Sequence, residues 1–235
     1  GPYFDPEMVR DGEKVQYRGY TTDLITDLSL EWLENRDPER PFLLMYHHKA
    51  PHRPWEPDDK HAHLYDGIDI PEPETFHDDY ATRAEAAHVA AMTVEHHMNA
   101  IDVKVQPVAG VKPNEGLPVP EDIGSYSLTT KDGETVTFKS KAELKSWKYQ
   151  RYIKDYLRCV AAVDDNVGRV LDWLDAQGLA DDTIVIYTSD QGFFLGDHGW
   201  YDKRFMYEES LRMPFIVRCT GIVKPGLVTD SFAIH

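Results

Sequence analysis

Cysteine is scarce in this chain, and no long apolar run is present. Two cysteines among 235 residues cannot build a disulfide framework, and their separation matches no zinc-binding pattern. No apolar stretch approaches the roughly 18 residues that a membrane-spanning helix needs, and the first residues do not form a signal peptide. These absences exclude a disulfide-stapled small protein, and we predict no membrane partner.

Basic residues are also scarce relative to acidic ones. The chain has 25 Lys and Arg against 41 Asp and Glu, which gives a net charge of -16. Nucleic-acid-binding proteins usually carry a basic face, and no RNA or DNA motif is present, so we predict no nucleic-acid partner. Because the net charge repels anionic ligands at long range, binding of such a ligand would need a local cluster of positive charge.

Patterns typical of helices and strands alternate along the chain and predict an α/β fold. We expect helices over residues 21–37, 80–99 and 142–176, and strands over residues 42–46, 183–187 and 213–218. Strands that alternate with helices favour right-handed crossovers, and therefore a largely parallel sheet with helices on both faces.

The stretch from about residue 100 to residue 145 interrupts this alternation. Prolines and glycines predict a loop over 101–125, and two short strand patterns joined by Lys131-Asp132-Gly133 predict a β-hairpin over 126–138. An insertion of this kind either carries substrate specificity on a rigid scaffold or is a surface excursion, and the sequence leaves both interpretations open.

The segment after the strand predicted at 183–187 carries the clearest functional pattern. Asp190 and Gln191 supply a carboxylate and an amide oxygen side by side, which suit Ca²⁺ or Mg²⁺ better than zinc. Ligands of open α/β sheets bind beyond the carboxyl ends of strands, which is where this pair is expected. Lys203 adds a compact positive charge suited to an anion near a metal. The spacing alone is equally compatible with an ordinary turn at Gly192.

A second polar segment follows the strand predicted at 42–46. It holds three histidines together with Lys49 and Arg53, a cationic group in which a neutral His can donate or accept a proton. For most of these residues, a role in a proline-stiffened surface loop is the more ordinary interpretation. We favour His52 as the functional residue because Pro51 and Pro54 restrict the chain around it.

Together the two segments resemble the type I, formylglycine-dependent sulfatases of the alkaline-phosphatase superfamily. The pattern is Lys-Ala-Pro-His-Arg-Pro, followed by Thr-Ser-Asp-Gln-Gly and by Asp-His-Gly-Trp-Tyr-Asp-Lys-Arg-Phe-Met-Tyr-Glu-Glu-Ser. Within that family the chain is similar to bacterial exo-acting glycan sulfatases, a group that includes N-acetylglucosamine-6-sulfatases. The resemblance implies an alkaline-phosphatase-like fold, with residues 1–235 in one catalytic domain, and hydrolysis of sulfate esters on sulfated carbohydrates.

The resemblance also implies a role for individual residues. Asp190 and Gln191 match calcium ligands. His52 matches a histidine that contacts the sulfate, and Lys203 matches a lysine that bridges sulfate and nucleophile. Substrate-binding roles are expected for His198, Lys49 and Arg53. Family members of this kind are commonly periplasmic or secreted, which is the expected location.

The sequence lacks residues that the family needs for catalysis. The 235 residues contain no Cys-x-Pro-x-Arg or Ser-x-Pro-x-Arg segment, whose first residue becomes formylglycine. Cys159 and Cys219 are predicted to be small buried side chains rather than nucleophiles. The Asp-Asp pair that completes the family's calcium site is missing as well. The resemblance therefore implies the later half of a catalytic domain, inactive alone. One interpretation that the sequence leaves open is a separate N-terminal segment that completes the active site.

Two further functions stay open on the sequence. A phosphodiesterase or phosphonate hydrolase of the same superfamily would be expected to use more histidine-rich, transition-metal ligation. A non-catalytic fragment or glycan-binding module would need no nucleophile at all.

Overall fold

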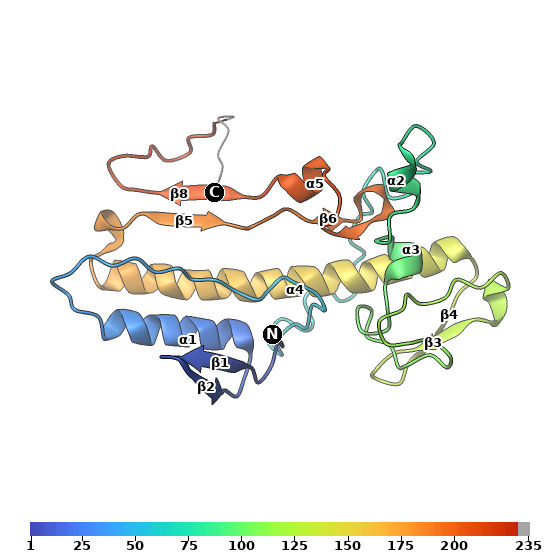
Figure 1. Cartoon of the computed structure of the whole chain (residues 1–235), viewed down its shortest axis with the longest axis horizontal. Coiled ribbons are helices and arrows are strands. Elements are labelled where there is room, and N and C mark those ends of the chain that lie inside the picture. Colours follow the sequence, from blue (N-terminus) through green and yellow to red (C-terminus); the bar gives the residue numbers. More distant parts are fainter. Residues whose placement is uncertain (230–235) are drawn as a thin grey trace. The chain divides into compact units, whose positions relative to one another are not determined.

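A computed structural model describes residues 1–229, and these divide into two compact units (Figure 1). Unit 1 comprises Gly1–Asp66 and Lys154–Thr183, and unit 2 comprises Gly67–Ile153 and the chain from Ile184 onward. The long helix α4 (Lys141–Ala176) contributes residues to both units.

Unit 1 begins with a hairpin that the sequence analysis did not predict. Strands β1 (Glu7–Arg10) and β2 (Glu13–Gln16) pair antiparallel. They turn at Asp11 and Gly12, whose φ angles of 53° and 87° are the positive values that a two-residue type I′ turn requires. The Asp-Gly dipeptide was therefore a usable signal.

Helix α1 (Thr21–Glu34) confirms the helix predicted over 21–37. It is joined to the unit 1 part of α4 by polar contacts. The Asn166 amide donates to Asp23 Oδ1 at 2.7 Å, and Arg169 forms an ion pair with Asp27. Unit 1 ends in the short helix η2 (Ala180–Asp182).

The strand predicted at 42–46 is wrong. Residues 41–49 form no strand, because no other part of residues 1–229 pairs with them. The segment still shows the alternation of an extended chain, since Leu43 and Met45 are 84% and 71% exposed while Phe42 and Leu44 are partly buried.

Unit 2 is built from short elements around the first part of α4. Its elements are α2 (Glu85–His88), α3 (Val94–His97), η1 (Ile123–Ser125), β3 (Ser127–Thr129), β4 (Thr135–Thr137), β5 (Val185–Thr188), β6 (Phe194–Leu195), η3 (Asp197–Gly199), β7 (Tyr201–Asp202), α5 (Glu208–Leu211) and β8 (Phe215–Arg218). One buried cluster consists of Ala87, Met92, Phe194 and Trp200. Two of its members, Phe194 and Trp200, flank the turn at Asp197–Gly199 in the sequence.

The helix predicted over 80–99 is instead two short helices, α2 and α3. The chain breaks between them because Thr93 forms a β-bridge with Trp200, and its side chain accepts a hydrogen bond from the backbone N–H of His96 to cap α3. The β3–β4 hairpin confirms the one predicted over 126–138.

Helix α4 confirms the helix predicted over 142–176. It ends at Ala176. Gly178 follows with a φ of 67°, and the N–H of Leu179 donates to the carbonyl of Leu174 at 2.9 Å, a common C-terminal arrangement. Among residues 1–229, no helix combines the length and the apolar composition that crossing a bilayer demands.

The strands do not pair in the way the sequence analysis expected. All the strand pairs in the described part of the chain are antiparallel, including β5 with β8, whereas we predicted a largely parallel sheet. Parallel neighbours need a long crossover connection. Between β5 and β8 the chain supplies only short elements, and it returns beside β5 in the opposite direction.

Candidate active site

The predicted metal ligands lie directly after β5. Asp190 is exposed and Gln191 is partly buried. Gly192 follows, and its N–H donates to the carbonyl of Ser210 at 2.7 Å. A Cβ atom at position 192 would lie 2.1 Å from the carbonyl oxygen of Glu209, so only glycine allows this approach to α5. Backbone packing thus fixes the point from which Asp190 and Gln191 extend.

Asp190 and Gln191 could supply some, but not all, of the ligands of a hard cation such as Ca²⁺. Both offer oxygen, the ligand type that Ca²⁺ prefers, but Ca²⁺ takes about six to eight oxygens. Within residues 1–229, no group of three or more His, Cys, Asp or Glu side chains is placed to hold a metal. The calcium-binding role of this pair therefore stays a prediction that requires further ligands.

His198 lies in a tight turn at the centre of unit 2. It adopts a left-handed conformation with φ 56°, and its backbone N–H donates to Thr75 Oγ1 at 3.0 Å. Its carbonyl accepts a hydrogen bond from the hydroxyl of Tyr80. Gly199 follows with φ 68°, and a Cβ there would lie 2.8 Å from the carbonyl of Phe76. Segments distant in sequence hold this turn in place.

The imidazole of His198 is part of a partly buried network of charged side chains. Its Nδ1 lies 2.8 Å from Asp78 Oδ2, and Arg83 binds the same oxygen through NH2 at 3.1 Å. Hydrogen bonds from His198, from the backbone of Tyr80 and from Arg83 lower the pKa of Asp78 to about 2. Arg83 NH2 is also 3.4 Å from His198 Nδ1. Since an ionised Asp78 can only accept, Nδ1 carries a proton toward Asp78 and the Arg83 approach is a contact between two donors.

Aromatic rings surround the rest of the His198 side chain, which leaves the residue 8% exposed. The centroids of Trp200 and Tyr207 lie 5.5 Å and 5.2 Å from that of the imidazole. Its Nε2 is 3.8 Å from Glu209 Oε1. A direct contact between His198 and a substrate, which the sequence analysis predicts, would have to use this Nε2 edge.

Lys203 follows β7 in the same unit and is partly buried. Its ammonium lies 5.9 Å from the ring centroid of Phe193, a distance typical of cation–π contact. Its neighbour Arg204 is tied to Asp202 by an ion pair at 3.0 Å. The predicted catalytic lysine is therefore held beside an aromatic ring by the chain that leaves β7.

His52 lies in unit 1, at the tip of a loop with an exposed ring. Lys49 organises this loop, because its ammonium donates to the carbonyls of His52 at 3.1 Å and of Arg53 at 2.7 Å and lies 4.6 Å from the ring centroid of Tyr3. The His52 Nδ1 is 2.8 Å from the Arg53 carbonyl. A proton on Nδ1 satisfies that contact, and within the described residues no hydrogen bond involves Nε2.

His48, just before this loop, is a histidine without hydrogen-bond partners in the described part of the chain. Both of its ring nitrogens are inaccessible to solvent, and its ring packs edge-on against Tyr46 with centroids 4.4 Å apart. Burial, with a smaller contribution from His47, lowers the pKa of His48 to about 4. His48 is therefore neutral at physiological pH.

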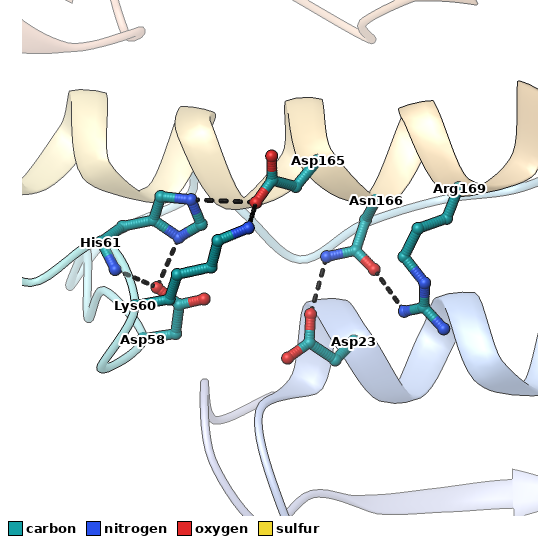
Figure 2. A pocket seen from close by; sticks show the side chains of 7 residues that line it. All are labelled: Asp23, Asp58, Lys60, His61, Asp165, Asn166 and Arg169. Carbon is teal, nitrogen blue, oxygen red and sulfur yellow. Dashed lines mark hydrogen bonds and ion pairs between the residues drawn. The ribbon is translucent and has the colours of Figure 1, made fainter. Parts of the chain in front are cut away.

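Unit 1 contains a pocket with a volume of about 380 Å³. Its lining residues, drawn in Figure 2, are Asp23, Asp58, Lys60, His61, Asp165, Asn166 and Arg169. His61 is 6% exposed and lies between two carboxylates. Its Nδ1 is 2.6 Å from Asp58 and its Nε2 is 3.1 Å from Asp165, which Lys60 also binds. Each nitrogen of the His61 ring therefore faces a carboxylate. The pocket polar groups largely satisfy one another, and the loop that follows His52 is anchored to α4 through them.

The predicted site residues thus fall into two groups. His52, Lys49 and Arg53 belong to unit 1, and Asp190, Gln191, His198 and Lys203 belong to unit 2. Sequence reasoning missed Asp78, Arg83 and His61. Cys159 and Cys219 are buried and form no disulfide within the described residues, which confirms their prediction as small interior side chains.

Comparison with known proteins places this fold and these motifs in one family. The sequence profile of the Sulfatase family matches residues 3–233. The chain therefore belongs to the sulfatase family, as predicted from its motifs.

Individual relatives agree with this assignment. An N-acetylglucosamine-6-O-sulfatase of Bacteroides thetaiotaomicron is 42% identical over 248 residues, which cover 100% of this chain and 44% of that protein. A solved structure of a protein in complex with its substrate, D-glucosamine-2-N,6-O-disulfate, superimposes with a TM-score of 0.80 at 39% identity and covers 95% of this chain and 48% of that one. The α/β, sulfatase-like fold class predicted from the sequence is confirmed.

A more distant structure shares the fold alone. The phosphonate monoester hydrolase of Agrobacterium radiobacter superimposes with a TM-score of 0.57 at 19% identity and covers 86% of this chain and 34% of that one. The chain spans less than half the length of the relatives that it matches.

Proposed function

We propose that the protein to which this chain belongs is a sulfuric ester hydrolase that removes sulfate from a sulfated sugar. The supporting observation is the 42% identity to an N-acetylglucosamine-6-O-sulfatase across the whole chain. A 6-O-sulfated N-acetylglucosamine is accordingly the first substrate to test, and a sulfated polysaccharide containing it is the second.

Asp190 and Gln191 would hold part of a calcium site at the end of β5. A bound divalent cation stabilises negative charge that develops on a transferred group. The nucleophile is expected to be a formylglycine from a Cys- or Ser-x-Pro-x-Arg segment, which is not among these 235 residues. That segment would be supplied by the same polypeptide or by a separate one.

Lys203 and His52 are the proposed catalytic residues of this chain. An ammonium beside the sulfate stabilises charge on its oxygens in the transition state, and Lys203 supplies one. His52 presents Nε2 from an exposed ring, so its protonated form can donate to a sulfate oxygen or to the departing sugar oxygen. Lys49 already donates to two loop carbonyls, which supports a contribution to substrate binding through the position of His52 and Arg53.

Sulfate release from N-acetylglucosamine 6-sulfate tests this proposal directly. In the calcium-loaded protein, K203A and H52A should each lower turnover more than tenfold. The matched controls K131A and H63A, which alter exposed side chains, should keep the parent rate. Unchanged turnover in K203A or H52A would remove that residue from the mechanism. Intact-mass spectrometry of the same sample shows whether a formylglycine-bearing segment is present.

A phosphonate or phosphate diester hydrolase is the second candidate, and the fold shared with a phosphonate monoester hydrolase motivates it. Metal analysis separates the two. Calcium together with sulfate release supports the sulfatase, whereas zinc or manganese together with phosphonate hydrolysis supports the alternative.

A glycan-binding role without catalysis is the third candidate, because the 235 residues hold no formylglycine segment. Calorimetric titration that detects sugar binding in a sample that releases no sulfate would favour it. We further propose that the protein works in the periplasm or outside the cell, which fractionation of the producing cells would test.

A further inference from the structure

Arg83 occupies an unusual position for an arginine that is one-third exposed. It lies just before α2, and its Nε and NH2 lie 3.3 Å and 3.1 Å from the same carboxylate oxygen of Asp78. Its side chain is 34% exposed, against 16% for that of Asp78. The guanidinium is thus held by the Asp78 carboxylate while about a third of the side chain stays exposed.

The face of the guanidinium is held as well. Its central carbon lies 5.5 Å from the ring centroid of Tyr207, and Tyr207 belongs to the segment that begins at Lys203. Stacking on a ring and a forked contact with a carboxylate together fix the plane of an arginine side chain. Arg83 is therefore oriented by the same chain segment that carries the proposed catalytic lysine.

Asp78, which holds Arg83, is itself firmly placed. It accepts the Nδ1 proton of His198 at 2.8 Å and the backbone N–H of Tyr80 at 2.9 Å. A guanidinium fixed in this way loses little side-chain freedom when it binds a ligand. Another carboxylate beside His198, that of Glu209, faces Nε2 of the imidazole, which is not the ring nitrogen near Arg83.

We propose that Arg83 is a specificity-determining residue that binds a second anionic group of the sugar, in addition to the ester sulfate that is hydrolysed. This inference rests on the proposed sulfatase function. An arginine has five N–H donors and no acceptors, so the exposed part of the Arg83 guanidinium favours an anionic ligand. In a chain with a net charge of -16, such a ligand needs a fixed local cation.

Two substrates that differ in one anionic group test the proposal. Kinetics are measured with D-glucosamine-2-N,6-O-disulfate and with N-acetylglucosamine 6-sulfate, which lacks the N-sulfate. A hydrogen bond to a charged group corresponds to roughly 10- to 100-fold in affinity. R83Q should therefore raise KM for the disulfate about tenfold, leave KM for the monosulfate within about twofold, and leave kcat unchanged for both.

The matched control is R212Q, which removes an exposed arginine of the same unit for which no ion pair is seen in the described residues. It should change neither KM. An equal rise in KM for both substrates in R83Q, or no rise, overturns the proposal. Thermal melting checks that R83Q is folded. If it is not, R83K keeps the charge without the fork, and a retained preference for the disulfate in that variant counts against the proposal.

Direct binding separates this inference from the proposed function. The disulfate is titrated calorimetrically into the calcium-loaded protein, with R83Q and R212Q in parallel. If the parent binds the disulfate about tenfold more tightly than R83Q but releases no sulfate, Arg83 is supported and the hydrolase function fails. If the parent releases sulfate and R83Q binds equally well, the function stands and the Arg83 role is wrong. If the parent does not bind the disulfate, the Arg83 role is also wrong.

Discussion

Around His198, charged and aromatic side chains find partners within unit 2, whereas the β5–β8 pair exposes apolar side chains on both of its strands. Ile186, Phe215 and Ile216 are 55%, 50% and 63% exposed, while His198 and Trp200 are 8% and 0% exposed. Yet the two regions are continuous in sequence, since the chain leaves β5, forms the site and returns in β8 (Figure 1).

This difference indicates what each region requires from its surroundings. The His198 region takes its geometry from contacts between residues 75–83 and 194–209, all within one unit. Strands that are apolar on both faces belong to sheets packed on both sides, and the β5–β8 pair leaves much of that surface uncovered. The charged network should therefore govern the stability of this chain more than the exposed strand residues do.

Removal of Asp78 is the strongest test of the difference between the His198 region and the β5–β8 pair. D78A deprives His198 and Arg83 of their shared acceptor, and a buried donor without a partner is costly. We expect the free energy of unfolding to fall by about 3 kcal/mol in chemical denaturation. D79N alters the neighbouring exposed carboxylate and should cost less than about 1 kcal/mol. Equal losses in the two variants would show that Asp78 is not the anchor.

His48 gives a second test, in unit 1 and through pH. Its pKa is lowered from 6.5 to about 4 in the folded chain, so the unfolded chain takes up a proton first as the pH falls. The stabilising contribution is complete above pH 6.5 and is lost as the pH falls toward 4, by roughly 2 to 3 kcal/mol. Denaturation of the parent and of H48L across this range measures it, and parallel curves would contradict the assignment.

Acid should also weaken the Asp78 network, at a lower pH than the one at which His48 becomes protonated. Because the folded pKa is about 2 against an ordinary value of 3.8, the stabilisation is present above pH 3.8 and disappears as the pH falls through 2. We expect a loss of roughly 1 to 2 kcal/mol. Carboxyl carbon NMR of Asp78 follows the titration, and a midpoint near 4 would mean that His198 and Arg83 do not stabilise the carboxylate.

The smallest effect is expected on the β5–β8 pair. I216T changes an exposed side chain and should alter the free energy of unfolding by less than about 0.5 kcal/mol. M92T changes a core residue that is 3% exposed and should cost roughly 2 to 4 kcal/mol. A loss near 2 kcal/mol in I216T would show that this strand is packed in solution.

Sequence patterns predicted the elements that depend on local periodicity or turn chemistry. Helix α4 and the β3–β4 hairpin are of this kind, since an apolar stripe and the Gly133 turn define them. The Asp11-Gly12 hairpin was missed although its signal was present. The break between α2 and α3 could not be predicted, because Thr93 pairs with Trp200 far along the chain.

The candidate site divides in the same way. Asp190, Gln191, Lys203 and His52 could be proposed because they belong to contiguous motifs that resemble a family. Asp78 reaches His198 across 120 positions of sequence, and no local pattern indicates such a pair. His61 and Asp58 are only three positions apart. The second carboxylate that contacts His61, that of Asp165 on α4, is distant in sequence, so no local pattern indicates it.

Gly192 also has a consequence for how the site can move. Its N–H is bonded to Ser210, and the absence of a side chain lets the chain after β5 touch the backbone at Glu209. Asp190 and Gln191 directly precede Gly192, and Glu209, whose carboxylate faces His198, lies on the opposite side of this backbone contact. The contact therefore links the proposed metal ligands to Glu209. A shift of Asp190 and Gln191 along the strand axis would be transmitted to α5. We therefore expect these two residues and Glu209 to move together.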